Sequence, residues 1–326
     1  MAEPAARGAA VSMRGVIVTY PGAGRRAVDD VRLDVPAGEL VVLLGPSGCG
    51  KSTLLRTINR LVIPDSGDVV VDGTNVRDAS PETLRRGIGY IIQAVGLFPH
   101  MSVARNVGIV PELLSWDRAR IDARVDELLA LVALDPKGYR NRLPRELSGG
   151  EAQRVGVARA LAAEPRVLLM DEPFGAVDVI VRTALQDETL RIHRALGTTI
   201  FFVTHDVDEA LRIADRIVVM NAGRIVQADT PLRVLAHPAT PYVEALLDTR
   251  DTVRRLGLLH VRDAMSRGAA PGAPSDGSVP ADATLREALG LLLGGARRLA
   301  VDGTNGATLD FDGVRQALAA TAREPA

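Results

Sequence analysis

A glycine-rich stretch, GPSGCGKST at positions 45–53, limits the folds open to this chain more than any other feature. It follows a continuously apolar run, ELVVLLG (39–45), and leads into STLLRTINRL (52–61), whose apolar residues recur at helical spacing. A strand, a glycine loop and a helix in this order match the pattern G-x-x-x-x-G-K-[ST]. The sequence therefore predicts a loop that cradles phosphate groups.

Each residue type in the stretch suits a phosphate ligand. The glycines let backbone N–H groups converge, and the helix that follows adds its positive N-terminus. Lys51 is one of two lysines among 39 basic residues, and its thin stem can return over the loop to the β- and γ-phosphates. Ser52 would place its hydroxyl on Mg²⁺. Kinases, GTPases and ATPases share this motif, and a chance glycine turn is the remaining alternative. The expected nucleotide-binding residues are Gly45, Pro46, Ser47, Gly48, Cys49, Gly50, Lys51, Ser52 and Thr53.

Short apolar runs that alternate with helical patterns predict a parallel α/β sheet. Three runs are apolar throughout, as strands covered on both faces are. They are RVLLMDE (166–172), TIFFVTH (199–205) and RIVVM (216–220). Helical patterns at 180–196 and 206–214 lie between them, and residues 112–147 indicate consecutive helices that form an inserted lobe.

Composition excludes several classes of protein. A length of 326 residues allows two domains, and a net charge of −1 with 3% aromatic residues argues against a nucleic-acid partner. The single cysteine, Cys49, points to a reducing compartment. We see no signal peptide and no apolar run of about 20 residues, so we expect a soluble, cytosolic chain.

A pair of acidic residues ends the run at 166–172. Asp171 stands where a carboxylate directed at Mg²⁺ belongs, at the carboxyl edge of a parallel sheet. Glu172 follows and could polarise a water for attack on the γ-phosphate. The alternative is that both are ordinary solvated acids at a strand end. The neighbouring phosphate loop argues against that alternative.

A second helix start with anion-binding character occurs in LSGGEAQRVGVARAL (147–161). Ser148, Gly149 and Gly150 precede this helix, so the chain has two such starts, more than one ATP requires. Over about residues 14–250 the order of motifs resembles the nucleotide-binding subunit of ABC transporters. That resemblance implies a P-loop ATPase with a parallel core sheet, an N-terminal antiparallel β subdomain and a helical signature subdomain. It also implies a head-to-tail homodimer in which each ATP meets Ser148, Gly149, Gly150 and Glu151 of the other copy.

The same resemblance implies roles for four further residues. Tyr20 would stack on adenine, and Gln93 would touch Mg²⁺ and sense the transmembrane partner. His205 would be the switch histidine that contacts the γ-phosphate, and Asp178 in the D-loop would contact the opposite subunit. Without the family pattern, Tyr20 reads as a packed strand-end aromatic and His205 as a structural histidine.

The chain departs from the family signature at Glu151, where a glutamine is usual. A carboxylate suits the helix dipole but not an anionic nucleotide. We expect Glu151 to point away from the γ-phosphate and ATPase activity to survive.

Several segments resemble the subunits of one class of importer. IIQAVGLFPHMSVARNV (91–107) resembles the surface that receives a permease in importers, and FGAVD (174–178), residues 203–247 and VRDAM (261–265) resemble the glycine betaine/proline/choline uptake ATPases. This implies ATP and Mg²⁺ as cofactors, a separate permease, an extracytoplasmic solute-binding protein as an indirect partner, and a peripheral place on the cytoplasmic face of the membrane. Import of an amino acid, sulfonate or polyamine, or a non-transport ABC ATPase, are the alternatives.

The C-terminal residues 251–326 form a separate tail in this interpretation. About residues 260–320 resemble one degenerate CBS motif, a small αβ unit, interrupted by a Gly/Pro-rich linker at 267–280. Such a unit buries little apolar surface alone. It would either pair with its counterpart in the partner subunit or be a remnant.

Overall fold

The computed structural model describes residues 8–22, 24–92, 96–175, 179–249, 251–265, 275–304 and 306–321. The chain divides into two compact units, Met1–Val226 and Gln227–Ala326, and each is described by itself.

A six-stranded sheet carries the predicted phosphate loop, with strand order β10-β9-β3-β8-β7-β6. Its strands are β3 (Leu40–Leu44), β6 (Ile88–Ile91), β7 (Val167–Asp171), β8 (Thr199–Thr204), β9 (Arg216–Asn221) and β10 (Arg224–Asp229). Strand β3 is parallel to β8 and β9, and β7 is parallel to β6 and β8. Every residue of β3, β7 and β8 is buried, which confirms the prediction of strands covered on both faces.

Three helices connect these strands close to where the sequence predicts them. They are α1 (Lys51–Ile58), α7 (Val179–Leu196) and α8 (Val207–Ile213). The sheet is therefore of the α/β type, and its parallel strands place the loops that follow β3, β7 and β8 at one edge.

A second, antiparallel sheet with strand order β2-β1-β4-β5 precedes and follows α1 in the sequence. Its strands are β1 (Val11–Val18), β2 (Val28–Val35), β4 (Ser66–Val71) and β5 (Thr74–Asn75). Buried and exposed residues alternate along β2, as they do in a strand with one face on the core. Val16 and Val31 of this sheet, Leu55 of α1 and Leu43 of β3 belong to one core, so both sheets pack around α1. The short helix α2 (Pro81–Arg86) follows β5.

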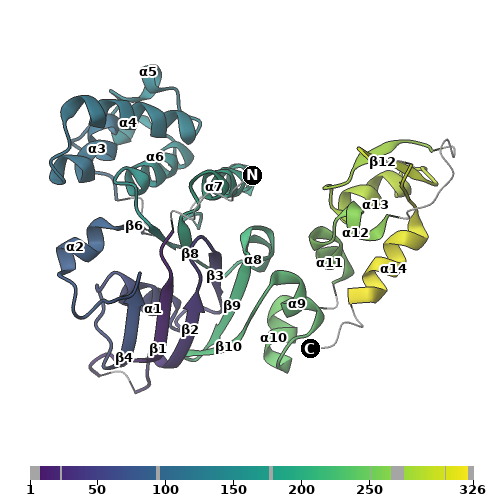
Figure 1. Ribbon diagram of the computed structural model, residues 1–326, viewed down its shortest axis with the longest axis horizontal. Helices are drawn as coiled ribbons and strands as arrows, with labels where there is room; N and C mark the ends of the chain where they lie inside the picture. Colours follow the sequence, from purple (N-terminus) through teal and green to yellow (C-terminus); the bar gives the residue numbers. More distant parts are fainter. Residues whose placement is uncertain are drawn as a thin grey trace. The chain divides into compact units, whose positions relative to one another are not determined.

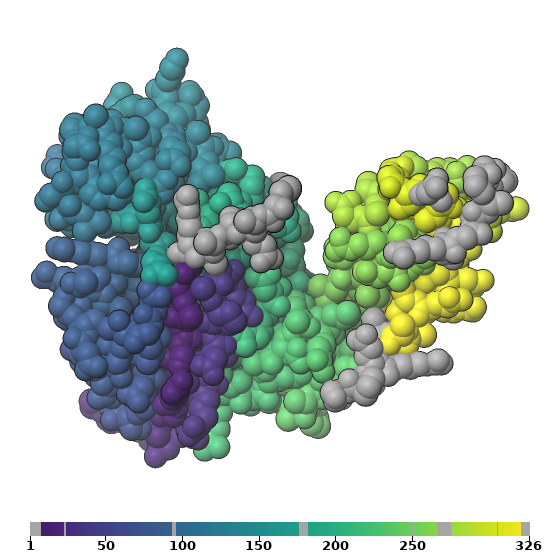
Figure 2. Space-filling view, in the orientation of Figure 1, coloured from purple at the N-terminus to yellow at the C-terminus, as the bar shows by residue number. Residues whose placement is uncertain are grey.

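A helical lobe is inserted between β6 and β7, and Figure 1 shows its helices gathered on one side of the sheets. In Figure 2 the same residues, in teal, form a distinct lobe of the first unit. The elements are α3 (Val103–Leu113), α4 (Arg118–Leu131), α5 (Pro136–Tyr139), a 3₁₀ turn (Pro144–Glu146) and α6 (Gly149–Leu161). The lobe begins earlier than the predicted 112–147, because Ser102 caps α3 by accepting a hydrogen bond from the Arg105 N–H.

The second unit holds a small αβ arrangement. Its helices are α9 (Pro231–Ala236), α10 (Pro241–Leu247), α11 (Thr252–Leu258), α12 (Val261–Ala264), α13 (Leu285–Leu293) and α14 (Phe311–Thr321). Strands β11 (Ser278–Pro280), β12 (Leu299–Asp302) and β13 (Thr308–Leu309) form a three-stranded sheet. Leu256, Val279, Leu285 and Leu309 share its core, so α11, the sheet and α13 pack together.

The predicted linker at 267–280 is wrong at its C-terminal end. Ser278–Pro280 forms strand β11, parallel to β12, because Val279 is buried in the core of this unit. Residues 267–274 of the linker lie outside the described residues. Helices α9 and α10 belong to the second unit, whereas the sequence assigns them to the 14–250 domain; those domain limits and the CBS likeness stay predictions. Within the described ranges no helix has the length and apolar character needed to cross a membrane.

Candidate nucleotide-binding site

The loop between β3 and α1 has a shape that only glycine permits at two positions. Gly50, just before α1, has a φ of 109°, and a Cβ there would lie 2.1 Å from the carbonyl oxygen of Ala27. A Cβ on Gly45 would lie 2.3 Å from the carbonyl oxygen of Met220. The backbone of the loop is thus packed directly against both neighbouring segments, one from each sheet.

Lys51 folds back over this loop, as the sequence predicts. Its Nζ donates hydrogen bonds to the carbonyl oxygens of Gly45 at 2.6 Å and of Pro46 at 3.0 Å, and the residue is only 4% exposed. The flexible stem makes this return possible, and the ammonium carries three N–H donors. The positive charge therefore lies within the loop, close to its backbone.

Ser52 and Asp171 meet at the edge of the six-stranded sheet. The Ser52 hydroxyl donates a 2.6 Å hydrogen bond to Oδ1 of Asp171, while Arg56 donates to Oδ2 at 3.3 Å and Tyr90 to the same oxygen at 3.5 Å. Burial raises the pKa of Tyr90, and its hydroxyl raises the pKa of Arg56, so we expect both to keep their protons.

This donor set fits magnesium. A hydroxyl and a carboxylate are hard oxygen ligands, and protein Mg²⁺ sites commonly use one or two such groups together with substrate phosphates. No cluster of three or more His, Cys, Asp or Glu side chains that could hold a metal occurs in the described part of the chain. The oxygens of Ser52 and Asp171, 2.6 Å apart, are suited to a metal ion whose remaining ligands come from elsewhere.

Glu172 and His205 form a second polar pair next to Asp171. Glu172 has a left-handed φ of 46°, and its N–H donates to the Val203 carbonyl of β8 at 3.0 Å. Its Oε1 lies 3.4 Å from Nδ1 of His205, whose side chain is 59% exposed. Both residues line a small pocket of about 40 Å³ together with Phe174 and Thr204. A carboxylate and an imidazole that line one pocket can accept a proton or orient a water molecule.

Tyr20 lies beside the phosphate loop. Its hydroxyl is 3.3 Å from the hydroxyl of Thr53, and the residue is 42% exposed, so it is not a packed core aromatic. Arg25 also contacts this loop, because its guanidinium donates to the Gly48 carbonyl at 3.3 Å. The exposed ring stands next to the loop, as adenine stacking would require.

The signature residues occupy the N-terminus of α6 in the helical lobe. Ser148 and Gly149 are exposed. The Ser148 hydroxyl accepts from the Glu151 N–H at 3.3 Å, and the Glu151 carboxylate accepts from the Ser148 N–H at 2.6 Å, which is a capping box. The hydroxyl of Tyr139 donates to the other oxygen of Glu151 at 2.5 Å. Gly149 and Gly150 lie between the two partners of the box.

Polar contacts thus join Tyr20 to Thr53, Lys51 to Gly45, Ser52 to Asp171 and Glu172 to His205. Gln93 and Asp178 lie outside the described residues. The roles assigned to all of these side chains stay predictions.

Four residues near these groups were missed from the sequence. Arg56 lies four positions after Ser52 on the same helix, a spacing that places both on one face and could have indicated it. Tyr90 lies on β6, the strand next to β7, so sheet order would have been needed to find it. Arg25 and Tyr139 follow no local pattern that predicts their contacts.

Comparisons with known proteins agree with this geometry. Residues 28–175 match the family model described as ABC transporter. The osmoprotectant import ATP-binding protein OsmV of Salmonella typhimurium is 50% identical over 246 residues, which are 76% of this chain and 64% of that protein's length. The glycine betaine uptake system ATP-binding protein YehX of Escherichia coli K12 is 51% identical over 271 residues, 82% of this chain and 86% of that protein.

Among solved structures, the dimeric ATP-binding cassette MJ0796 bound to ADP and Pi superposes with a TM-score of 0.61. It is 30% identical, and the match covers 68% of this chain and 98% of that one. The glycine loop with Lys51 and the Ser52–Asp171 contact lie within residues 28–175, the part that the family model matches. The chain belongs to the family of ABC transporter ATP-binding proteins.

Proposed function

We propose that the chain is the ATP-hydrolysing subunit of an ABC importer for an osmoprotectant or quaternary amine, such as glycine betaine, proline, choline or carnitine. The observation that carries this proposal is the 51% identity with a glycine betaine uptake ATP-binding protein over 86% of that protein's length. The geometry supports ATP chemistry, because Ser52, Asp171, Glu172 and His205 lie at adjacent loops of one sheet edge.

In this proposal each described side chain acts on a stated part of the nucleotide. Lys51 and the backbone of 45–53 neutralise and orient the phosphates, since the ammonium lies inside the loop. Tyr20 stacks on the adenine from beside Thr53. Glu172 accepts a proton from the attacking water, and His205, within 3.4 Å, orients the γ-phosphate.

Magnesium, when bound, would neutralise charge on the β- and γ-phosphates. Ser52 and Asp171 would hold it, because their oxygens already meet at 2.6 Å. Gln93 would be a further ligand. Arg56 and Tyr90 keep Asp171 in place through hydrogen bonds to its second oxygen.

Two copies would enclose two ATP molecules head to tail. Ser148 and Gly149 are exposed at the start of α6 and therefore accessible to a second copy. Asp178 would contact the opposite subunit. Closing of the dimer would drive a separate permease on the cytoplasmic face of the membrane, and the extracytoplasmic solute-binding protein would act through that permease.

The test of the ATPase assignment is Glu172→Gln. This substitution keeps the size of the side chain but removes the proton acceptor, so we expect hydrolysis to slow by at least about 10²-fold and an ATP-bound dimer to accumulate. Size-exclusion chromatography with ATP measures the dimer. Rapid hydrolysis by the variant would place the base elsewhere.

The solute is identified by uptake in a strain that lacks the gene. Radiolabelled glycine betaine, choline, carnitine and proline are compared, with an amino acid, a sulfonate and a polyamine as the competing arms. Uptake of a competing solute alone would leave the ATPase assignment intact and overturn the substrate class. Co-purification with nucleic acid or ribosomes instead of a permease would favour a non-transport role.

We also propose that residues 14–250 form the ATPase domain and that the 251–326 tail, with its CBS-like part at about 260–320, is dispensable for hydrolysis. Deletion of 260–326 should leave basal ATPase activity and alter dimer stability or osmotic regulation. Unchanged uptake and assembly would favour a remnant.

A further inference from the structure

The carboxylate of Glu151 is held by two donors from different elements. The Ser148 N–H donates to Oε2 at 2.6 Å within the capping box of α6, and the Tyr139 hydroxyl donates to Oε1 at 2.5 Å. Donation from Tyr139, and then from Ser148, lowers the pKa of Glu151 to about 2. The reciprocal effect raises the pKa of Tyr139. A fully ionised carboxylate therefore stands at the start of the signature helix at neutral pH.

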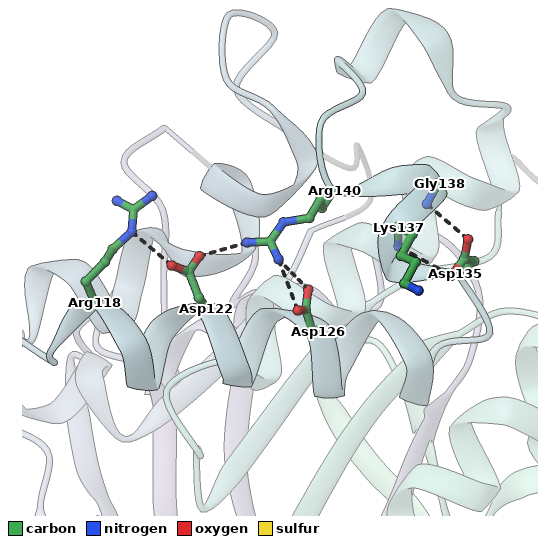
Figure 3. Close-up of polar contacts among 7 residues, drawn as sticks. All are labelled: Arg118, Asp122, Asp126, Asp135, Lys137, Gly138 and Arg140. Carbon is green, nitrogen blue, oxygen red and sulfur yellow. Dashed lines mark hydrogen bonds and ion pairs between the residues drawn. The ribbon is translucent and has the colours of Figure 1, made fainter.

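Tyr139 is well placed to fix that carboxylate because its own helix is anchored. Figure 3 shows Arg140, the next residue, between two acids of α4: it donates to Asp122 at 2.8 Å and to both oxygens of Asp126 at 3.0 Å. At the other end of α5, Asp135 accepts from the Lys137 and Gly138 N–H groups. The guanidinium of Arg142 lies 4.2 Å from the centroid of the Tyr139 ring. The hydroxyl of Tyr139 is thus presented from a fixed scaffold.

A negative charge at this position is a liability for a site that must accept an anion. The N-terminus of α6 attracts negative charge, and Ser148 and Gly149 are exposed there. If Glu151 were free to turn outward, its carboxylate would occupy or repel the same approach that a phosphate would take. The Tyr139 hydroxyl and the Ser148 N–H together restrict that freedom, one at each oxygen of the carboxylate.

We propose that Tyr139 is a positioning residue that holds the Glu151 carboxylate in the capping box and keeps the exposed start of α6 open to the phosphates of the nucleotide bound by the second copy. This inference rests on the proposed ATPase function. The inference explains how the chain can carry a charged glutamate at position 151, where the family signature usually has a neutral glutamine.

The test is a double-mutant cycle with Tyr139→Phe and Glu151→Gln, in which KM for MgATP and kcat are measured separately. Tyr139→Phe removes one charge-assisted hydrogen bond, so we expect KM to rise about tenfold and kcat at saturating ATP to change less than about twofold. On the Glu151→Gln background no charge remains to be restrained, so Tyr139→Phe should change KM less than about twofold.

Arg118→Ala is the matched control. Arg118 is 85% exposed and pairs with Asp122 in the same lobe, so its loss should leave KM and kcat unchanged. Equal effects of Tyr139→Phe on both backgrounds, or no effect on KM at all, overturn the proposal. ATP hydrolysis by the wild type that is lost on substitution of Lys51 tests the ATPase function independently. A failure of that function can therefore be told apart from a failure of the Tyr139 proposal.

A second measurement does not depend on a Tyr139 variant. The chain has four tyrosines, and Glu151→Gln should lower the pH at which one of them ionises, since the carboxylate raises the pKa of Tyr139. Tyrosinate absorbance during alkaline titration reports this shift. An unchanged titration curve would show that the two side chains do not interact and would also overturn the proposal.

Discussion

The hydroxyl of Ser52 donates a 2.6 Å hydrogen bond to the carboxylate of Asp171, 119 positions later in the sequence. Ser52 lies in the first turn of α1, directly after the loop that follows β3, and Asp171 ends β7. In the sheet these two strands are separated by β8 alone. The contact therefore depends on the strand order of the parallel sheet and not on proximity in the chain.

Asp171→Asn tests the importance of this contact. The amide keeps the shape but lacks the charge that a magnesium ion requires, and it leaves Arg56 without its carboxylate partner. We expect kcat for ATP hydrolysis to fall by about 10²-fold or more. Activity is measured at several Mg²⁺ concentrations.

Asp187→Asn is the control, because Asp187 forms an exposed ion pair with Arg212. It should behave as wild type. Near-normal, Mg²⁺-dependent hydrolysis by Asp171→Asn would contradict the assignment.

Lys51→Arg tests why the chain keeps a lysine in the loop. Lys51 is 4% exposed and its ammonium lies beside loop carbonyls, so we expect a bulkier, planar guanidinium to fit poorly there. ATP affinity should fall at least about tenfold by isothermal titration calorimetry. Lys137→Arg, at the other lysine, which is exposed, should bind ATP as wild type does. If the wild type, Lys51→Arg and Lys137→Arg bind ATP with equal affinity, Lys51 has no role that arginine cannot fill.

Glu151 predicts a pH dependence of stability. Its pKa is lowered to about 2 from 4.5, so its stabilising contribution is complete above about pH 4.5 and is lost as the pH falls toward 2. Glu151→Gln has no such group and should lose less stability than wild type over that range. Guanidinium unfolding curves at intervals between about pH 5 and pH 3 measure the difference. Parallel losses in both proteins would show that the carboxylate is not held as described.

We expect Gly50→Ala to lower both the folding stability of the protein and its ATP binding. The new Cβ would lie 2.1 Å from the Ala27 carbonyl oxygen at a residue with a φ of 109°, so the loop must move. We expect a cost of about 2–4 kcal/mol in the free energy of unfolding.

Gly24→Ala is the matched substitution on the same unit. Apart from its chain neighbours, no heavy atom lies within 4 Å of a Cβ placed at Gly24. We therefore expect thermal denaturation to give a melting temperature close to that of the wild type. A similar melting temperature for the two variants would mean that the loop adapts.

The sequence predicts the local parts of this protein well. The strand at 39–45 and the helix after Ser52 follow from an apolar run and from helical spacing, and they correspond to β3 and α1. The return of Lys51 over the loop follows from its flexible stem, whereas its hydrogen bonds to the loop carbonyls follow from no sequence pattern. The sequence does not place the start of the lobe correctly. The capping residue Ser102 lies in the segment 91–107, which is considered from the sequence only as a surface that receives a permease.

Contacts between distant segments could not be predicted in the same way. Tyr90 reaches Asp171 only because β6 pairs with β7, and Tyr139 reaches Glu151 only because α5 is anchored on α4 through Arg140. The sequence places β11 in a linker because three residues are too few to show periodicity; the strand exists because it pairs with β12 and buries Val279. These features depend on tertiary packing, which a single sequence does not display.

The close packing of Gly50 on Ala27 and of Gly45 on Met220 has a mechanical consequence. The Gly223 N–H donates to the Cys49 carbonyl at 2.9 Å, and the Asp29 N–H donates to the Gly223 carbonyl at 2.8 Å, so a continuous chain of backbone contacts runs from the edge of the antiparallel sheet to the loop. Backbone hydrogen bonds and close glycine contacts therefore couple the loop to that edge, so a tilt of the antiparallel sheet would displace the loop as well.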